Sequence, residues 1–194
     1  MSRPLTIGLT GGIAAGKSTA LAALGRQGAA TISSDAVVHE LLDSEPLLGR
    51  LIERWGDEVA PGGAVDRAKV GEIVFADPEQ LSWLESQVHP LVGERIGRWL
   101  ASLPAGTELA VIETPLLFEA EMDGVFDANV AVITSDEVRR RRAEARGHTL
   151  VEERDARQLP QEVKAERADH VIENDGSIED LERSLSALVA KLRG

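Results

Sequence analysis

A glycine-rich stretch near the start of the chain restricts the possible folds more than any other part of the sequence. Residues 11–19 read GGIAAGKST and fit the phosphate-loop pattern G-x-x-x-x-G-K-[ST] without a mismatch. The apolar run 4–10 before them indicates a buried strand, and the Ala/Leu-rich run 19–25 after them indicates a helix. Because a phosphate loop needs this order of strand, glycine loop and helix, we prefer it to a glycine-rich turn with a solvated lysine.

This stretch predicts that the chain binds a nucleoside triphosphate. Successive backbone N–H groups and the positive end of the helix dipole would cradle the phosphates. Lys17 would bridge the β- and γ-phosphates, and the Ser18 hydroxyl would hold Mg²⁺. The residues expected to surround the nucleotide phosphates are Gly12, Ile13, Ala14, Ala15, Gly16, Lys17, Ser18 and Thr19.

The amino-acid composition limits the kinds of partner that the protein can bind and its expected location in the cell. The chain has 194 residues, a net charge of −12 and no cysteine. The acidity argues against a general nucleic-acid binder, and the lack of cysteine excludes disulfides, thiolate zinc sites and a cysteine nucleophile. No signal-type segment opens the sequence, and no apolar run approaches the ~20 residues that a membrane-spanning helix needs. We expect a cytoplasmic monomer whose partners are small molecules, not nucleic acid or a membrane.

Five short apolar runs predict strands, at residues 4–10, 28–33, 108–113, 128–133 and 168–174. Since helical patterns separate them, we expect an α/β fold with a parallel, doubly wound sheet of the P-loop NTPase type. We expect a single domain, 1–194. Its core comprises 1–43, 105–138 and 168–194, with a helical insertion at about 44–104 and a lid at about 139–167.

Acidic residues follow two of the predicted strands at the edge where ligands gather in such sheets. Asp35 comes just after the strand 28–33 and has a catalytic or metal-linked role, although it would also suit a helix cap. Glu113 ends the strand 108–113, where a Walker B acid holds the metal directly or through water. His39, one helical turn after Asp35, either faces the same cleft or lies on the surface.

The region 44–104 has no strand pattern and predicts helices at 47–55, 69–75 and 79–86, followed by a long one at 88–103. We expect Pro90 near the first position of that last helix. His89 would then either cap the helix or bind a phosphate at its N-terminus. The region is either a decorative insertion or a wall for an acceptor substrate, and its place after Asp35 favours the wall.

One dense basic cluster stands out in this acidic chain, comprising Arg139, Arg140, Arg141, Arg142 and Arg146. Arg142 and Arg146 are four residues apart and share a helix face, whereas Arg140 and Arg141 suit a solvated face. Arg154, Arg157 and Lys164 continue the charge. We favour a lid that brings arginines over the transferring phosphates.

Several short motifs together resemble the dephospho-coenzyme A kinase family over residues 5 to about 185. They are GLTGGI before GKS, Asp35 with His39, His89-Pro90, PLLFE at 115–119, and ADHVIENDGS at 168–177. The phosphate loop is common to many families, but the His-Pro and PLLFE elements in this order are more specific. The resemblance implies transfer of the ATP γ-phosphoryl group, with Mg²⁺, to the ribose 3′-hydroxyl of dephospho-coenzyme A, the last step of coenzyme A synthesis.

The resemblance also implies roles for individual residues. Asp35 would be the catalytic base, with Lys17 and Arg146 on the phosphates. Arg142 would lie near the adenine, with Asn174 and Gly176 in the loop beside the base. The expected acceptor-binding residues are Thr10, Asp35, His39, His89, Pro115, Leu116, Leu117, Phe118 and Glu119.

The chain departs from the family pattern at a few positions. Ser33 stands where an acid is frequent, Ala14-Ala15 where Gly-Ser is frequent, and Asp155 where an apolar residue is common. Two other functions fit the phosphate loop: another small-molecule kinase, or a nucleotide-dependent switch. The absence of the guanine-specific Asn-Lys-x-Asp tetrad counts against the usual form of such a switch.

Overall fold

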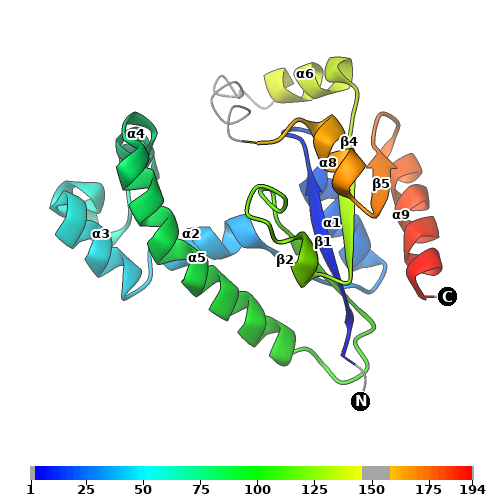
Figure 1. The fold of residues 1–194 in the computed structure, drawn as a ribbon, viewed down its shortest axis with the longest axis horizontal. Coiled ribbons are helices and arrows are strands. Elements are labelled where there is room, and N and C mark those ends of the chain that lie inside the picture. The colour runs from blue at the N-terminus through cyan, green and yellow to red at the C-terminus, as the bar shows by residue number, and fades with distance from the viewer. Residues whose placement is uncertain (1–2, 146–157, 194) are drawn as a thin grey trace. The chain divides into compact units, whose positions relative to one another are not determined.

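The structure, a computed structural model, describes residues 3–145 and 158–193 and divides into two compact units (Figure 1). The α/β unit consists of residues 1–33 and 103–194, and the helical unit consists of residues 34–102. The helical unit thus begins at Ser34, earlier than the boundary near residue 44 that the sequence predicts. None of the described helices is long and apolar enough to cross a membrane.

The α/β unit is built on a parallel sheet that contains all five predicted strands. The strand order is β2-β3-β1-β4-β5, and every neighbouring pair is parallel. The strands are β1 (Leu5–Gly11), β2 (Ala30–Ser33), β3 (Leu109–Glu113), β4 (Ala128–Ile133) and β5 (His170–Glu173). The predicted fold class is therefore confirmed.

Helices cover both faces of this sheet, with α8 (Gln161–Arg167) in front of the strands in Figure 1 and α1 (Lys17–Arg26) behind them. On one face, α1 and α9 (Ile178–Arg193) bury alternate strand residues such as Ile7 and Leu9. On the other face, α8 packs against β4 and β1. There Gly8 leaves room for Leu117 and Phe126, because a Cβ at Gly8 would lie 2.5 Å from each. Among the described residues, the unit also contains the helix α6 (Asp136–Ala145) and a short 3₁₀ turn at Asp123–Val125.

The helical unit contains α2 (Ser34–Leu42), α3 (Leu47–Trp55), α4 (Arg67–Ala76) and α5 (Pro78–Ala101), with 3₁₀ turns at Asp57–Val59 and Pro61–Gly63. Its core is entirely apolar and comprises Leu42, Leu47, Leu51, Val59, Val70, Val74 and Val88. Trp55 and Trp83 pack edge to face with their ring centroids 5.1 Å apart. Asp66 and Asp77 cap the starts of α4 and α5 by accepting hydrogen bonds from backbone N–H groups.

The expectation of two helices at 79–86 and 88–103 is wrong, because α5 runs through both as one helix with Pro90 inside it. Proline removes one backbone hydrogen bond from a helix interior. The helix continues because apolar residues on both sides of Pro90 pack on the same core, among them Leu84 and Leu91. His89 therefore lies on the exposed side of a helix interior, not at the N-terminus that a phosphate-binding role would need.

Candidate active site

The phosphate loop connects the end of β1 to the start of α1 in a conformation that depends on glycine. Gly16 has φ +100° and is the residue that precedes α1. A Cβ at Gly11, which has φ +147°, would lie 2.1 Å from the carbonyl oxygen of Val132. No side chain in the described residues caps α1. The first backbone N–H groups of this helix therefore receive no hydrogen-bond acceptor from a capping side chain. This arrangement has the geometry that favours anions at a helix N-terminus.

The predicted phosphate ligands Lys17 and Ser18 lie at the start of α1. Lys17 Nζ donates to the carbonyl oxygens of Gly11 (3.1 Å) and Gly12 (2.9 Å), so the ammonium group is held over the loop. Ser18 is exposed at the second position of the helix. Both side chains are thus on the loop that the sequence pattern predicts.

The end of β5 meets the last residues of the phosphate loop. The buried Asn174 side chain donates from Nδ2 to the carbonyl oxygen of Ala15 at 2.7 Å. A Cβ at Gly16 would lie 2.2 Å from that nitrogen, so the two residues are in close contact. Gly176 lies further along in the exposed turn between β5 and α9.

Arg142, the predicted adenine residue on α6, also reaches this region. The Arg142 Nη1 atom would lie 3.8 Å from a Cβ built at Gly16. This nitrogen is buried and has no hydrogen-bond partner in the described part of the chain. The Thr134 hydroxyl and the Ser135 amide, helped by the Arg142 charge, hold the pKa of the exposed Asp175 carboxyl below its ordinary value. A cation with an unused donor beside the phosphate loop suits a nucleotide ligand.

The rest of the basic cluster is mostly at the surface. Arg140 and Arg141 are exposed, in agreement with a solvated face, and Arg139 pairs with Asp136 at 3.2 Å. Arg146, which the sequence assigns to the transferring phosphates, lies outside the described residues, as do Arg154, Asp155 and Arg157.

The acidic residue Glu113 and the hydroxyl of Thr10 lie at the same sheet edge as the phosphate loop. Glu113 is buried at the last position of β3, paired in register with Leu9 of β1 and Ser33 of β2. Thr10 is also buried and donates to the carbonyl oxygen of Pro115 at 3.1 Å. The parallel sheet brings these residues together as the strand ends predict.

The PLLFE segment has mixed exposure. Leu117 and Phe118 are 0% and 1% exposed, so their side chains pack inside the unit, whereas Leu116 is 38% exposed. Glu119 forms an ion pair of 2.9 Å with Lys164, whose side chain is fully buried. The Arg167 guanidinium stacks over the Phe118 ring at 4.7 Å. Leu116 is therefore the most exposed apolar residue of the segment.

The remaining predicted residues belong to the helical unit. Asp35 is exposed in the first turn of α2, which starts directly after β2. His39 is exposed on the same helix, and its carbonyl oxygen accepts a hydrogen bond from Arg67 at 3.4 Å. His89 is exposed on α5.

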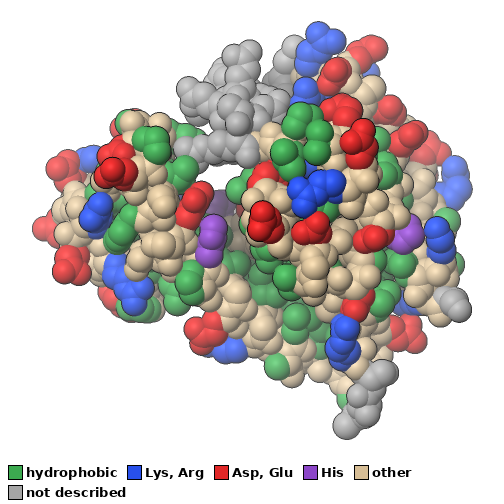
Figure 2. Space-filling view, in the orientation of Figure 1, with side chains coloured by type: hydrophobic (Ala, Val, Ile, Leu, Met, Phe, Trp, Pro, Cys, Tyr) green, Lys and Arg blue, Asp and Glu red, His purple; other side chains and the backbone are tan. Residues whose placement is uncertain are grey.

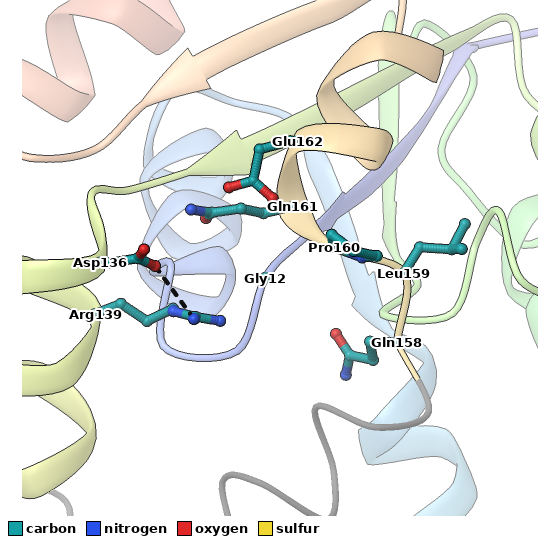
Figure 3. Close-up of a pocket in the computed structure, with 8 residues that line it drawn as sticks. All are labelled: Gly12, Asp136, Arg139, Gln158, Leu159, Pro160, Gln161 and Glu162. Carbon is teal, nitrogen blue, oxygen red and sulfur yellow. Dashed lines mark ion pairs between the residues drawn. The ribbon is translucent and has the colours of Figure 1, made fainter.

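A pocket of about 290 Å³ adjoins the phosphate loop within the α/β unit (Figure 3). It is lined by Gly12, Asp136, Arg139, Gln158, Leu159, Pro160, Gln161 and Glu162. The sequence patterns did not single out 158–162, because these residues match no motif. Acidic and basic side chains are interspersed over the face of the protein shown in Figure 2.

A phosphate loop at the carboxyl edge of a parallel five-stranded sheet, with a basic helix beside it, defines a P-loop kinase. The family model for dephospho-CoA kinase matches residues 5–180. The chain therefore belongs to the dephospho-CoA kinase family. It is a phosphotransferase that uses ATP to phosphorylate dephospho-coenzyme A, the last step of coenzyme A synthesis.

Individual members of the family are similar in sequence to almost the whole chain. The dephospho-CoA kinase of Anaeromyxobacter dehalogenans is 42% identical over 97% of this chain and 92% of the relative. The dephospho-CoA kinase of Thermus thermophilus is 39% identical over 98% of this chain and 93% of the relative.

Solved structures give the same result. A Thermus thermophilus protein, TT1252, superposes with a TM-score of 0.83 at 40% identity and covers 100% of both chains. The dephospho-CoA kinase from Campylobacter jejuni superposes with a TM-score of 0.71 at 26% identity over 96% of each chain. Shikimate kinase from Acinetobacter baumannii, at 17% identity and a TM-score of 0.56, covers 97% of this chain and 94% of its own and shares the fold alone.

Proposed function

We propose that the chain transfers the γ-phosphoryl group of ATP to the ribose 3′-hydroxyl of dephospho-coenzyme A. The observation that carries the proposal is the phosphate loop, in which Gly16 leads into a helix whose first N–H groups have no capping side chain. Together with the family match over 5–180, this loop supports ATP as the phosphoryl donor.

The chain's own residues would act mainly by positioning and by charge. Phosphoryl transfer needs little covalent chemistry from the protein, because its transition state spreads charge over the phosphoryl oxygens. Lys17 lies over the loop and would move from the carbonyl oxygens of Gly11 and Gly12 to the β- and γ-phosphates. Arg142 beside the loop would contact the nucleotide near its adenine, and Arg146 would reach the phosphates.

Mg²⁺ suits the oxygen donors at the head of α1 and the end of β3. Ser18 presents an exposed hydroxyl, and Glu113 presents a carboxylate on a neighbouring strand. Because Mg²⁺ usually takes only one or two protein oxygens beside phosphates and water, these residues would hold it, Glu113 through water. When bound, the ion neutralises charge on the β- and γ-phosphate oxygens.

Asp35 would accept the proton of the acceptor hydroxyl. Its carboxylate is exposed in the first turn of α2, directly after β2. As the ribose oxygen bonds to the γ-phosphorus, the bond from that phosphorus to ADP breaks, and the hydroxyl proton moves to Asp35. The exposure of this side chain supports access by a substrate.

The residues proposed to bind the acceptor, as the family pattern implies, are His39 and His89 of the helical unit and residues 115–119 of the α/β unit. His39 and His89 are exposed, and Leu116 offers an apolar surface. Within the PLLFE segment, the Pro115 carbonyl oxygen accepts from Thr10 and the Glu119 carboxylate accepts from the Leu159 N–H, and these bonds would hold the segment in place. Asn174 and Gly176 would lie near the adenine of ATP. We propose further that the enzyme acts as a monomer in the cytoplasm.

An ATP-consumption assay with and without dephospho-coenzyme A tests the proposal. We expect strong stimulation by dephospho-coenzyme A, and phosphorus NMR of the product should place the new phosphate on the ribose 3′ oxygen. Coenzyme A is the matched control, because its 3′ position is already phosphorylated and it should not stimulate turnover. Phosphate at another position, or equal turnover without an acceptor, would contradict the assignment.

A further inference from the structure

We propose that Gln161 and Asn174 are positioning residues that hold the two ends of the phosphate loop in its binding conformation. Both side chains end in an amide, and both lie against the loop although they are far from it in sequence. The inference rests on the proposed binding of ATP by this loop, and it adds a role on the loop itself to the proposed position of Asn174 near the base.

Asn174 holds the end of the loop. Its Nδ2 donates to the carbonyl oxygen of Ala15 at 2.7 Å and lies close to Gly16, the residue from which α1 starts. With that bond made, the Ala15 carbonyl is turned toward Asn174. A carbonyl oxygen turned to a protein donor is turned away from a phosphate, which it would repel.

Gln161 holds the beginning of the loop. A Cβ at Gly12 would lie 3.2 Å from Gln161 Oε1 and 3.3 Å from its Cβ, so the side chain packs directly on Gly12. Figure 3 shows it extending from the first turn of α8 above the loop that carries Gly12. Within the loop, the Ala15 N–H donates to the Gly12 carbonyl oxygen at 3.3 Å. The two amides therefore contact both ends of this turn.

Thr134, directly after β4, contacts the side chain of Gln161 and the backbone of Asn174. Gln161 Nε2 donates to its carbonyl oxygen at 2.7 Å, and its N–H donates to Gln161 Oε1 at 3.2 Å. The Thr134 hydroxyl donates to the Asp175 carboxylate at 2.6 Å, and its oxygen lies 3.1 Å from the backbone carbonyl oxygen of Asn174. Because Thr134 is buried directly after β4, it provides a rigid base for the Gln161 side chain, while the backbone of Asn174 is held by the donation of its N–H to the Ile133 carbonyl oxygen at 2.9 Å.

Such a clamp would act on every ligand of the phosphate loop, whether or not the ligand has a base. A loop fixed before binding loses less conformational freedom when the phosphates arrive. The test therefore compares ATP with inorganic tripolyphosphate by calorimetry, without any acceptor. Gln161→Met keeps the side-chain length and removes both hydrogen bonds, and Asn174→Ala removes the bond to Ala15.

We expect each variant to lower the affinities for ATP and for tripolyphosphate by the same factor, about fivefold or more, as the loss of a buried hydrogen bond implies. Asn129→Ala is the matched control. Asn129 is a buried amide of β4 that donates to the backbone carbonyl of Asp123 at 3.0 Å. It should lower thermal stability as Asn174→Ala does and leave both affinities unchanged.

Two outcomes would overturn the inference. If Asn174→Ala weakens ATP binding but not tripolyphosphate binding, Asn174 acts on the base and not on the loop. If Gln161→Met binds both ligands as tightly as the unchanged protein, Gln161 does not position Gly12. If Asn174→Ala does not fold, Gln161→Met tests the same clamp from the partly exposed side. Failure of the proposed function would differ, because it would show as normal binding in these assays without stimulation by dephospho-coenzyme A.

Discussion

The two units of this protein use opposite kinds of interior. Every polar or charged residue that is buried in the described chain belongs to the α/β unit, namely Thr10, Glu113, Thr114, Asn129, Thr134, Lys164 and Asn174. In the helical unit, which is described in full, all the buried residues are apolar. Several of the polar residues hold loops at the carboxyl edge of the sheet, where phosphates are expected. Polar side chains are therefore buried in the unit whose loops need hydrogen-bond donors and acceptors in fixed positions.

This difference has an energetic reason. An apolar core tolerates changes of shape at moderate free-energy cost, whereas a buried polar group must keep its partner. We therefore expect substitutions of the buried polar residues that contact the phosphate loop to alter function and stability together. Substitutions in the helical core should alter stability alone, and the exposed residues of the helical unit should alter chemistry alone.

The largest expected effect concerns Asp35, an exposed residue of the helical unit. Asp35→Asn keeps the shape but removes the proton acceptor, and a general base typically contributes ~10²–10⁴ in rate. We expect turnover to fall by that factor while ATP affinity stays within several-fold and unfolding is unchanged. Lys17→Ala should instead weaken ATP binding as well, because Lys17 contacts phosphate before the reaction.

A coupled assay and calorimetry separate these two variants. Glu40→Gln is the matched control, because Glu40 is another exposed acid on α2 and pairs with Arg95 of the same helical unit at 3.7 Å. It should leave turnover unchanged. Near-normal turnover of Asp35→Asn would reduce Asp35 to a residue that stabilises the helix start.

The next effect concerns the buried ion pair of Lys164 and Glu119. Lys164 Nζ also donates to the carbonyl oxygen of Pro115 at 2.6 Å, and Glu119 accepts from the Leu159 N–H at 2.7 Å. Removing one partner of a buried pair costs about 3–5 kcal/mol, so Lys164→Met should lower the free energy of unfolding by that amount. Urea denaturation measures the loss.

The double variant Lys164→Met with Glu119→Gln sharpens the result, since it also removes the carboxylate that the single variant leaves unpaired. It should be more stable than the single variant. A loss below ~1 kcal/mol for Lys164→Met, typical of a surface pair, would break the contrast between the two interiors.

Leu51→Ala tests the apolar interior of the helical unit. Leu51 is completely buried, and such a truncation costs about 2–5 kcal/mol. ATP affinity, measured by calorimetry below the unfolding range, should be unchanged. Leu51→Met conserves volume and should cost less than ~1.5 kcal/mol. A marked loss of ATP affinity in Leu51→Ala would show that this core also controls the phosphate loop.

A smaller effect is expected at acid pH. Hydrogen bonds from Arg3, and from the amide and hydroxyl of Thr6, hold the pKa of the Asp127 carboxyl well below its ordinary value. A depressed folded pKa stabilises the protein above the unfolded pKa of ~3.9 and loses that contribution as the pH falls through the folded value. Asp127→Asn should therefore lower stability at pH 7 and make it less dependent on pH below ~4. An unchanged acid slope would contradict this account.

The smallest effect concerns the phosphate loop itself. Ala14 has φ +59°, a left-handed conformation that costs an L-residue about 1–2 kcal/mol, part of which glycine's greater chain entropy offsets. Ala14→Gly should raise the free energy of unfolding by about 0.5–1 kcal/mol without changing the loop's donors. Ala23→Gly, inside α1 with no such conformation, should lower stability by a similar amount and serves as the control. Destabilisation by Ala14→Gly would contradict the argument.

Local patterns were sufficient for the sheet and for the phosphate loop. The loop motif, the five apolar runs and the acids at their ends depend on spacings of a few residues, and the parallel topology follows from their alternation with helices. The same local reasoning failed at Pro90. Proline is a strong signal for a helix start, but apolar contacts on both sides of it keep α5 continuous.

Only the tertiary structure decided which polar side chains support the site. Gln161 carries no motif and Asn174 suggested a contact with the base, yet both lie against a loop that precedes them by more than a hundred residues in the chain. The buried pair of Lys164 and Glu119 joins segments that the sequence assigns to a lid and to an acceptor site. Sequence spacing reports periodic burial along one element, whereas a hydrogen bond between distant segments depends on where the packed sheet brings their atoms.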